Sequence, residues 1–179
     1  MALCVAIALL GGLALGQEVS DRLLQLAPKS EPGVKLVVRG TVRDEGGKPV
    51  PGAVLRVFQT DARGWYTPTK VMDEPNARLQ GYVRTGADGR YEVRTIRPGG
   101  YPHAPNARKS ERIPAHIHFE VRAEGFALRR LQLVFDDDPR MTPYWREWAK
   151  KDRNPIAKVE RGYGGKRSCK CEIVLARAR

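Results

Sequence analysis

The sequence has few cysteines and histidines, three of each among 179 residues. Cys4 lies in an N-terminal apolar segment, and the other two, Cys169 and Cys171, form a Cys-x-Cys pair near the C-terminus. A disulfide between residues i and i+2 of a strand would be strained, so no bridge is predicted. A zinc site would need further thiols or imidazoles, and the sequence shows no second cluster near this pair. Both cysteines therefore stay unassigned.

Acidic residues are also scarce, since 20 Asp and Glu stand against 32 Lys and Arg and give a net charge of +12. The basic residues are scattered along the chain and lack an accompanying motif of aromatic side chains for stacking on bases. Nucleic-acid binding is therefore not expected as the main function. The charge is interpreted as a basic surface that tolerates or attracts small anions.

Long apolar runs are missing beyond residue 16. Residues 1–16 are almost wholly apolar and small, and polarity begins at Gln17. This run is too short for a comfortable membrane span. It is interpreted as a signal peptide with a cleavage site at Ala14-Leu15-Gly16, although no Lys or Arg precedes it. We expect export to the periplasm or the extracellular space, without membrane insertion after cleavage; an uncleaved anchor is the weaker alternative.

Residues 17–35 form a polar lead-in that allows one short helix at 20–27, ended by Pro28. The remainder, 36–179, has the size of one domain with its own core. Short segments rich in branched and aromatic residues, separated by Gly and Pro turns, predict strands. These segments are 35–43, 53–59, 82–85, 91–96, 116–121, 128–135 and 173–175.

Two hairpin turns are expected, at 86–89 and at 124–125. Thr142-Pro143 begins the one clear helical segment, 142–148, whose tryptophans are expected to pack on the sheets. The pattern predicts an all-β fold, a β-sandwich or barrel with one short helix. Two long Pro- and Gly-rich loops, 60–80 and 98–114, are where a functional site is expected.

Two of the three histidines, His116 and His118, lie in the predicted strand at 116–121. Residues i and i+2 of a strand project from the same face, so both imidazoles can bind one ion, although histidines that face water or a core are an equal alternative. Each long loop adds a tyrosine in a Gly-rich context, Tyr66 and Tyr101. Either one alone is more often a packing residue. Two phenolates and two imidazoles together suit ferric iron, which drives the loss of the phenolic protons.

The order of motifs over about residues 36–138 resembles the intradiol ring-cleavage dioxygenases, most closely the protocatechuate dioxygenase subunits. The first motif alone is also similar to other prealbumin-like β modules. The joint pattern is specific, and it implies a prealbumin-like β-sandwich. The matching motifs are Gly40-x-Val42, Pro49-Val50-x-Gly52-Ala53, Gln59-x-Asp61-x-x-Gly64-x-Tyr66, Asp88-Gly89-x-Tyr91, Thr95-Ile96-x-Pro98-x-x-Tyr101, Pro114-Ala115-His116-Ile117-His118-Phe119 and Gln132-Leu133.

The resemblance implies that one Fe(III) cofactor is bound by four residues, Tyr66, Tyr101, His116 and His118. It further implies that a catechol-type substrate is cleaved by O₂ to a muconate-type diacid without an external reductant. Tyr101 is then the ligand that leaves the metal and accepts a proton.

Two further catalytic residues are implied, a glutamine and an arginine that stabilise charge on the substrate. Gln132 matches the glutamine. The family arginine precedes the first histidine by three residues, a position held here by Ile113, with Arg112 one residue further back. Arg112 is the candidate, and Arg97 or Arg108 would be its substitutes.

Other departures from the family concern packing, assembly and substrate. Phe58 stands where a tryptophan is usual, and the long helical N-terminal region of the catechol dioxygenases is missing, so a homo-oligomer is left open. Basic residues in the loops would suit a carboxylated catechol if they are not simply solvated. They are Lys70, Arg78, Arg108 and Lys109.

Three alternatives remain. A cupin would need another histidine on a later strand, and none follows His118. A three-histidine zinc enzyme would use His103 and leave the tyrosines unexplained. The strongest rival is an exported β-sandwich that binds a metal or another ligand without turnover.

Overall fold

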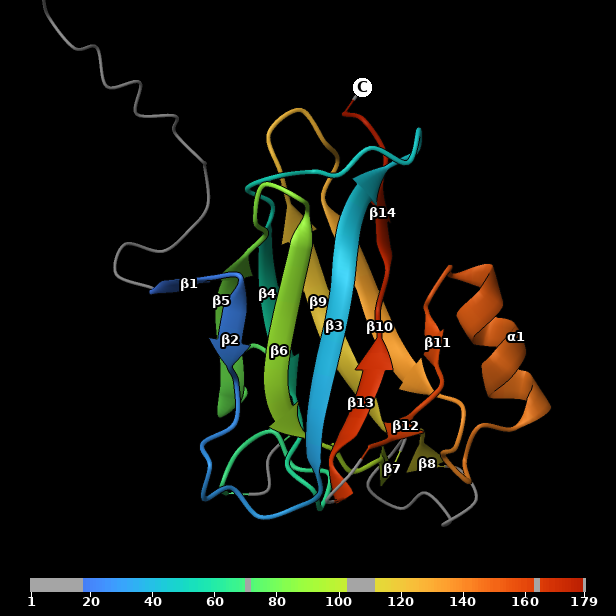
Figure 1. Cartoon of the computed structure of the whole chain (residues 1–179). Helices are drawn as coiled ribbons and strands as arrows, with labels where there is room; N and C mark the ends of the chain where they lie inside the picture. The colour runs from blue at the N-terminus through green and yellow to red at the C-terminus, as the bar shows by residue number, and fades with distance from the viewer. Residues whose placement is uncertain (1–17, 70–71, 103–111, 163–164, 179) are drawn as a thin grey trace, which may run out of the picture.

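The computed structural model describes residues 18–69, 72–102, 112–162 and 165–178, with the side chains of Pro102 and Arg112 excepted. Two β-sheets face each other, and one helix lies beside them (Figure 1). The prediction of an all-β sandwich with a single short helix is confirmed for these residues. The signal peptide predicted at 1–16 lies outside them. No helix within the described ranges is long and apolar enough to cross a bilayer.

The first sheet has the strand order β1-β5-β4-β9-β10-β11. Its four central strands, β5, β4, β9 and β10, pair with one another in antiparallel orientation. The edge strand β1 pairs with β5, and the edge strand β11 pairs with β10, both in parallel orientation. The bounds are β1 Val19–Asp21, β4 Val54–Gln59, β5 Leu79–Arg84, β9 His116–Arg122, β10 Arg129–Phe135 and β11 Ile156–Ala157.

The second sheet has the order β12-β13-β3-β6-β2, and β14 also pairs with the long strand β3. A separate two-stranded ribbon joins β7 and β8. The bounds are β2 Leu23–Gln25, β3 Lys35–Asp44, β6 Arg90–Ile96, β7 Tyr101–Pro102, β8 Arg112–Ile113, β12 Glu160–Arg161, β13 Arg167–Lys170 and β14 Ile173–Leu175.

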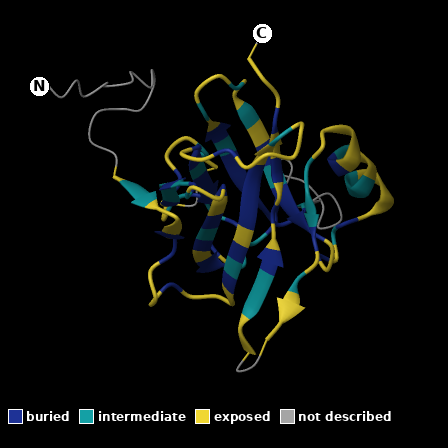
Figure 2. Cartoon of the chain, turned by 45° about the horizontal axis from the view of Figure 1, so that its top comes forward, coloured by how far each residue is buried: buried dark blue, intermediate teal, exposed yellow. Residues whose placement is uncertain are grey.

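The core lies between the two sheets, and buried and more exposed residues alternate along the strands (Figure 2). In β9, for example, Ile117, Phe119 and Val121 belong to the central hydrophobic cluster. This is the period-two pattern expected of a strand with one face on the core. The opposite face of β9 is therefore available for a site.

The helix expected at 20–27 is wrong, because the lead-in forms two strands instead. β1 pairs with β5 of the first sheet, and β2 pairs with β6 of the second. Between them Arg22 adopts a positive φ of 59° and redirects the chain. Leu24 and Leu26 alternate with polar residues and are buried in the core. The open sheet edges thus override the local helical tendency, and the lead-in closes one side of the sandwich.

The hairpin expected at 86–89 is also wrong, whereas the one at 124–125 is confirmed. β9 and β10 pair antiparallel across the second turn, with Val121 opposite Arg129. The first turn joins β5 of the first sheet to β6 of the second, so the strands it connects do not pair. Both edges of each strand are already occupied, β5 by β1 and β4, and β6 by β2 and β3. The turn therefore crosses between sheets.

The helix predicted at 142–148 is confirmed as α1, Pro143–Lys151, with Thr142 as its N-cap. Trp145 and Trp148 pack in a cluster with Val134 of β10, together with Met141, Ala149 and Ile156. The tryptophans therefore fix α1 against the outer side of the first sheet.

Gly40 marks a position on β3 where no side chain fits. A Cβ atom there would lie 1.8 Å from the carbonyl oxygen of Cys171, which also accepts a hydrogen bond of 2.7 Å from the hydroxyl of Tyr91. We expect Gly40→Ala to destabilise the fold by about 3 kcal/mol, because backbone must move to relieve the overlap. Equilibrium urea unfolding measures this loss. Gly47→Ala, where a Cβ meets nothing within 4 Å but φ is 80°, serves as the control with a smaller loss; equal losses would contradict the steric explanation.

Candidate metal centre

Two histidines project from the outer face of the first sheet. His116 and His118 alternate along β9 with Ile117 and Phe119, which point into the core. In register, Phe58 of β4 and Gln132 of β10 lie on either side of His118. Because neighbouring residues in a sheet share a face, these three side chains form one row. The strand pairing therefore places the predicted glutamine beside a predicted ligand.

Asp61 organises the loop that carries Tyr66. Its buried carboxylate accepts hydrogen bonds from the backbone N–H groups of Arg63 (2.8 Å) and Trp65 (3.0 Å). Its backbone carbonyl accepts from Gly64 (3.1 Å) and from Gly99 (2.8 Å) in the second long loop. This residue therefore fixes the turn before Tyr66 and ties it to the segment before Tyr101.

The two loops touch where both have glycine. A Cβ on Gly64, which has a φ of 94°, would lie 2.6 Å from the carbonyl oxygen of Gly100. A Cβ on Gly99 would lie 2.5 Å from the backbone nitrogen of Gly64. The hydroxyl of Thr60 also donates to the carbonyl of Gly99 at 2.8 Å. Glycine at these positions lets the loops approach closely enough to bring the two tyrosines together.

Four donor atoms form a closed ring on this face. The Tyr66 oxygen lies 2.8 Å from Nε2 of His118 and 3.4 Å from the Tyr101 oxygen. The Tyr101 oxygen lies 3.3 Å from Nε2 of His116, and the two Nε2 atoms are 3.0 Å apart. The structure thus brings together the four residues that the sequence predicted as ligands.

Hydrogen bonding and burial set the protonation of the ring. Nδ1 of His116 lies 2.7 Å from the carbonyl oxygen of Pro114. Because a carbonyl oxygen only accepts hydrogen bonds, Nδ1 of His116 carries the proton. Nε2 of His116 therefore presents its lone pair to the other three donor atoms. Burial lowers the pKa of His116, and burial with the nearby His116 and Arg56 lowers the pKa of His118 to about 2. Both imidazoles are therefore neutral.

The phenols are shifted in the opposite direction. Burial, then the neighbouring Tyr101, raises the pKa of Tyr66 far above its usual range. Burial raises the pKa of Tyr101 to about 12, with a further contribution from Glu74. Without a cation both phenols keep their protons at neutral pH. A highly charged ion is needed to convert them to phenolate ligands.

The donor set fits a first-row metal ion. Four N and O donors at about 2.0–2.2 Å from one ion lie about 3 Å from their neighbours, as these atoms do. Neutral imidazoles and phenolates are ligands of ferric iron. Among the residues that the structure describes there is no group of three or more His, Cys, Asp and Glu that would form another centre. His103, needed for the zinc alternative, lies outside them.

Neighbouring residues hold the ligands in place. The ring of Phe58 stacks on His118 with centroids 4.4 Å apart and an interplanar angle of 3°. Phe58, which stands where the resemblance implies a tryptophan, is thus in direct contact with a candidate ligand. Asp138, buried, accepts a hydrogen bond of 3.0 Å from the backbone N–H of Ala115, just before His116. Stacking and hydrogen bonds to a metal ligand or to its neighbouring residue, such as these two, orient the ligand.

A cleft of about 530 Å³ opens beside His118, which is the candidate ligand among its described lining residues. Its wall includes His118, Gln132, Phe58, Trp148 and Glu74. Gln132 is anchored through its backbone N–H, which donates to Oδ1 of Asn154 at 2.8 Å. The cleft has the size of a site for a small aromatic molecule.

Glu74 was not predicted from the sequence. Its Oε1 lies 3.4 Å from the Tyr101 oxygen and 3.9 Å from Nε2 of His118. Since His118 is neutral, the second contact is not an ion pair. The Glu74 side chain is 45% exposed, and no arginine or lysine of the described segments pairs with it. Glu74 lies in the predicted loop 60–80 that also carries Tyr66, but a single acidic residue in a loop carries no sequence signal that singles it out.

Of the three candidates for the arginine that stabilises charge on the substrate, the structure excludes one. Arg97 cannot serve the site, because its guanidinium stacks 3.9 Å from the centroid of Phe135 and pairs with Asp137 at 2.8 Å. Arg112 begins β8 and pairs with Pro102, but its side chain lies outside the described part, as does all of Arg108. A role for Arg112 therefore stays a prediction.

Arg78 is not a free cation for a substrate carboxylate. Its guanidinium makes two hydrogen bonds of 2.7 Å to the carboxylate of Glu31, which is buried. The other basic residues considered for this role, Lys70, Arg108 and Lys109, lie outside the described residues. The contact instead ties the lead-in to the loop that follows Tyr66.

Cys169 and Cys171 are free and buried in the central core. Burial raises the pKa of each thiol to about 12. Buried thiols of this kind are packing residues without nucleophilic reactivity.

Comparison with known proteins adds sequence and fold relationships. A family model described as Dioxygenase matches residues 13–160. The chain is 32% identical over 145 residues to catechol 1,2-dioxygenase 1 of Acinetobacter lwoffii, covering 74% of this chain and 45% of that protein. It is 37% identical over 137 residues to the protocatechuate 3,4-dioxygenase beta chain of Burkholderia cepacia, covering 72% and 57%. The chain spans about half the length of these curated relatives.

Solved structures show the same fold. Catechol 1,2-dioxygenase from Acinetobacter sp. ADP1 superposes with a TM-score of 0.72 at 22% identity, covering 92% of this chain and 60% of that one. The dioxygenase domain of a dioxygenase carbohydrate-binding protein fusion from Streptomyces sp. SirexAA-E gives a TM-score of 0.63 at 27% identity. In that pair the match covers 96% of this chain and 97% of the other.

Proposed function

Because the chain belongs to the intradiol ring-cleavage dioxygenase family, we propose that it cleaves a catechol-type aromatic between its two hydroxyl-bearing carbons, using O₂ and Fe(III). The observation that carries the proposal is the ring of four donor atoms, of which His118 lines an open cleft. Tyr66, Tyr101, His116 and His118 would hold the ion. Ferric iron, when bound, would draw electron density from a bound catecholate and activate its ring toward O₂.

The tyrosines and histidines have separate tasks in this proposal. The two neutral imidazoles supply lone pairs without a change of protonation. Tyr101 is the ligand that takes up a substrate proton on its phenolic oxygen. The pKa of Tyr101, about 12, makes its protonated form stable when it is free, and the Glu74 carboxylate, 3.4 Å away, accepts a hydrogen bond from it. The phenol can therefore hold a proton inside the site.

Gln132 and the apolar wall would position the substrate ring. Gln132 lies next to His118 in register and faces the cleft, so its side-chain amide can donate to a substrate oxygen. Phe58 and Trp148 line the same cleft and offer apolar surface for an aromatic ring. The substrate is bound between a polar and an apolar wall.

An oxygen-uptake panel tests the function. Iron-loaded protein is mixed with catechol, protocatechuate and hydroxyquinol, and O₂ consumption is followed together with the appearance of a diacid product. We expect uptake with at least one catechol and one O₂ consumed per ring opened. Protein that binds iron and is coloured but consumes no O₂ with any of them would favour the alternative, a binding module without turnover.

Glu74 sets an expected substrate preference. Two arginines also line the cleft, but Arg130 pairs with Glu120 at 3.3 Å and Arg129 donates to the backbone carbonyls of Asp152 and Arg153. The Glu74 carboxylate, 3.9 Å from Nε2 of His118, therefore disfavours substrates that carry a carboxylate, such as protocatechuate, relative to catechol. We expect Glu74→Gln to raise kcat/KM for protocatechuate relative to catechol by about tenfold, which is about 1.4 kcal/mol of differential binding. Steady-state oxygen uptake with both substrates measures the ratio.

Glu147→Gln is the matched control, because it removes the same charge from the exposed surface of α1. The ratio should stay constant in this variant. An unchanged ratio in Glu74→Gln would show that the carboxylate does not discriminate between the substrates.

We also propose that the protein is exported through the signal peptide at 1–16. The basis is the sequence alone. Expression of the full chain with recovery from the medium or periplasm, followed by N-terminal sequencing, tests it; a mature N-terminus at Met1 inside the cytoplasm would contradict it.

A further inference from the structure

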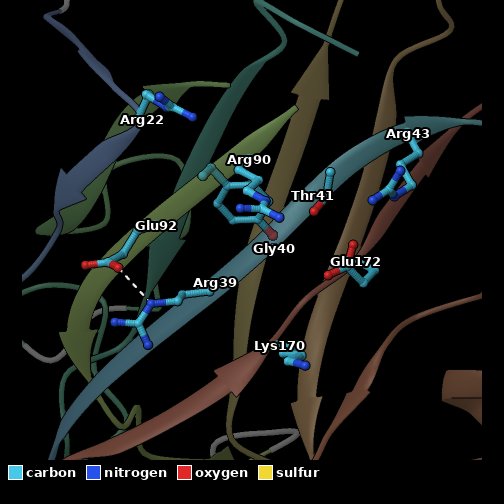
Figure 3. A pocket seen from close by; sticks show the side chains of 10 residues that line it. Arg22, Arg39, Gly40, Thr41, Arg43, Arg90, Glu92, Lys170 and Glu172 are labelled. Atoms are coloured by element: carbon cyan, nitrogen blue, oxygen red, sulfur yellow. Dashed lines mark hydrogen bonds and ion pairs between the residues drawn. The ribbon is translucent and has the colours of Figure 1, made fainter. Parts of the chain in front are cut away.

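The outer face of the second sheet is strongly basic. Along β3, residues at alternate positions point away from the core, and Arg39 and Arg43 are exposed there. Arg90 projects from β6 and Lys170 from β13 on either side (Figure 3). These residues surround a shallow hollow of about 730 Å³. We call the following set the basic sheet face: Arg22, Arg39, Arg43, Arg90, Arg94 and Lys170.

The carboxylates near this face are too few to neutralise it. Glu92 is shared between Arg39 (2.8 Å) and Arg94 (2.7 Å). Asp88 is shared between Arg22 (2.8 Å) and Arg90 (3.9 Å). Two carboxylates thus serve four guanidinium groups.

The other cations of the face have weaker internal partners. Arg43 donates to the neutral carbonyl of Gly47 at 3.0 Å. Glu172 at the edge of the hollow is the remaining carboxylate. Six cations therefore surround three carboxylates, and an excess of positive charge faces the solvent.

The hollow has a structural origin. β13 ends at Lys170, opposite Arg39, and β14 begins at Ile173, opposite Val42. Between them the chain turns in, so that the Cys171 carbonyl occupies the space above Gly40. Tyr91 is almost fully buried and donates its hydroxyl to that carbonyl. The floor of the hollow is therefore uncharged, and the charged side chains lie at its rim.

We propose that the basic sheet face binds an acidic polysaccharide, with the guanidinium groups contacting its carboxylates. A guanidinium matches a carboxylate in two-point geometry, and exposed arginines on neighbouring strands can contact successive charges of an extended polymer. The face lies on the second sheet, whereas the four donors and their cleft lie on the outer side of the first. A bound polymer would therefore leave the cleft open.

Duplex nucleic acid fits this face less well. Its charge density, one phosphate per about 1.7 Å of axis, would bring phosphates against Glu92 and Glu172 as well as the arginines. The described residues that line the hollow include one aromatic ring, Tyr91, and it is buried. No ring of this hollow is thus available for stacking on unpaired bases. A polymer with more widely spaced charges avoids both problems.

Variants of equal net charge test the location of the binding surface. The face variant is Arg39→Gln, Arg90→Gln and Lys170→Gln. The control variant removes three exposed cations outside the face, Arg122→Gln, Lys151→Gln and Lys158→Gln. Binding of fluorescent polygalacturonate to the full-length protein is measured in 0.15 M salt. We expect the face variant to bind at least tenfold more weakly than wild type and the control variant to change less than twofold.

Three results would overturn the proposal. No measurable binding of polygalacturonate by wild type would reject it outright. Equal weakening in the two variants would show that overall charge, and not this face, attracts the polymer. Tighter binding of a 20-base-pair DNA duplex or of phosphatidylserine vesicles, lost in the face variant, would assign the face to another class of partner. Thermal unfolding of both variants confirms that the fold is retained.

Discussion

Iron-loaded protein should be red to purple, and Tyr66→Phe or Tyr101→Phe should shift or bleach that colour and lower oxygen uptake by more than about a hundredfold. The colour would arise from charge transfer between phenolate and ferric iron. Loss of an outer contact to a metal ligand already costs about 10- to 100-fold, so loss of a ligand itself should cost more. Visible spectra and metal analysis at fixed iron loading measure the two effects.

Tyr66 should be the more damaging position. It is almost fully buried, it lies 2.8 Å from Nε2 of His118, and the turn organised by Asp61 precedes it. Tyr101 lies nearer the cleft rim, in contact with Glu74. We therefore expect Tyr66→Phe to lower iron content as well as colour, and Tyr101→Phe to change mainly the spectrum and the rate.

Tyr91→Phe is the matched control, because Tyr91 is also buried but belongs to the second sheet and donates its hydroxyl to the backbone carbonyl of Cys171. This variant should lose stability while its colour per bound iron stays the same. A colourless wild-type protein that contains one zinc ion per chain would contradict the ferric site.

The local sequence pattern was sufficient to predict half of the candidate centre and seven of the strands, β3, β4, β5, β6, β9, β10 and β14. His116 and His118 share a face because they are two residues apart in a strand, a property of the backbone alone. Their partners required loops to be placed, and periodicity does not place loops. The glycines before Tyr66 and Tyr101 were visible in the sequence, but the contact of Gly64 with Gly99 and Gly100 depends on the folded chain.

The two wrong predictions, the helix at 20–27 and the hairpin at 86–89, have a common physical cause. In both cases strands compete for the edges of the two sheets. The lead-in segment has short-range features of a helix, yet Leu24 and Leu26 are buried because β2 adds to an edge left open by β6. The turn at 86–89 has the sequence of a hairpin but joins two sheets. Which strand pairs with which edge is decided by the whole sandwich, not by the turn residues.

Ile113, at the position where the family motif has an arginine, has a packing role in this fold. It pairs with Tyr101 in the small ribbon of β7 and β8. Its side chain also packs against the cluster of Phe58, Tyr66, Ala77 and Tyr101. An apolar residue in this place supports the rings of both tyrosines. Ile113 therefore has a packing role, and Arg112 remains the predicted arginine with Arg108 as its substitute; Arg112→Ala is the variant that examines it.

Ferric iron binding should release two protons per site, so that its apparent affinity rises about a hundredfold for each pH unit between pH 6.5 and 8. Both imidazoles are already neutral in this range, because burial lowers the pKa of His116 below 6.5 and that of His118 to about 2. Both phenols are still protonated, because burial raises the pKa of Tyr101 to about 12 and that of Tyr66 further. The two displaced protons are phenolic.

The affinity for iron falls at lower pH because the displaced protons are phenolic. As pH falls, protons compete with the ion for the two phenolate oxygens, and the iron site weakens. Competition against nitrilotriacetate, whose own pH dependence is known, gives the affinity at each pH. Direct titration in weakly buffered solution counts the protons.

The number of protons identifies which groups bind. Tyr101→Phe should reduce the slope from about a hundredfold to about tenfold per pH unit, because one phenolic proton remains to be displaced. A slope near zero in wild type would mean that the tyrosines are not ligands, and a slope near four protons would mean that the imidazoles enter the site charged. Only a release of two protons agrees with a centre in which burial keeps both the histidines and the tyrosines uncharged until the ion arrives.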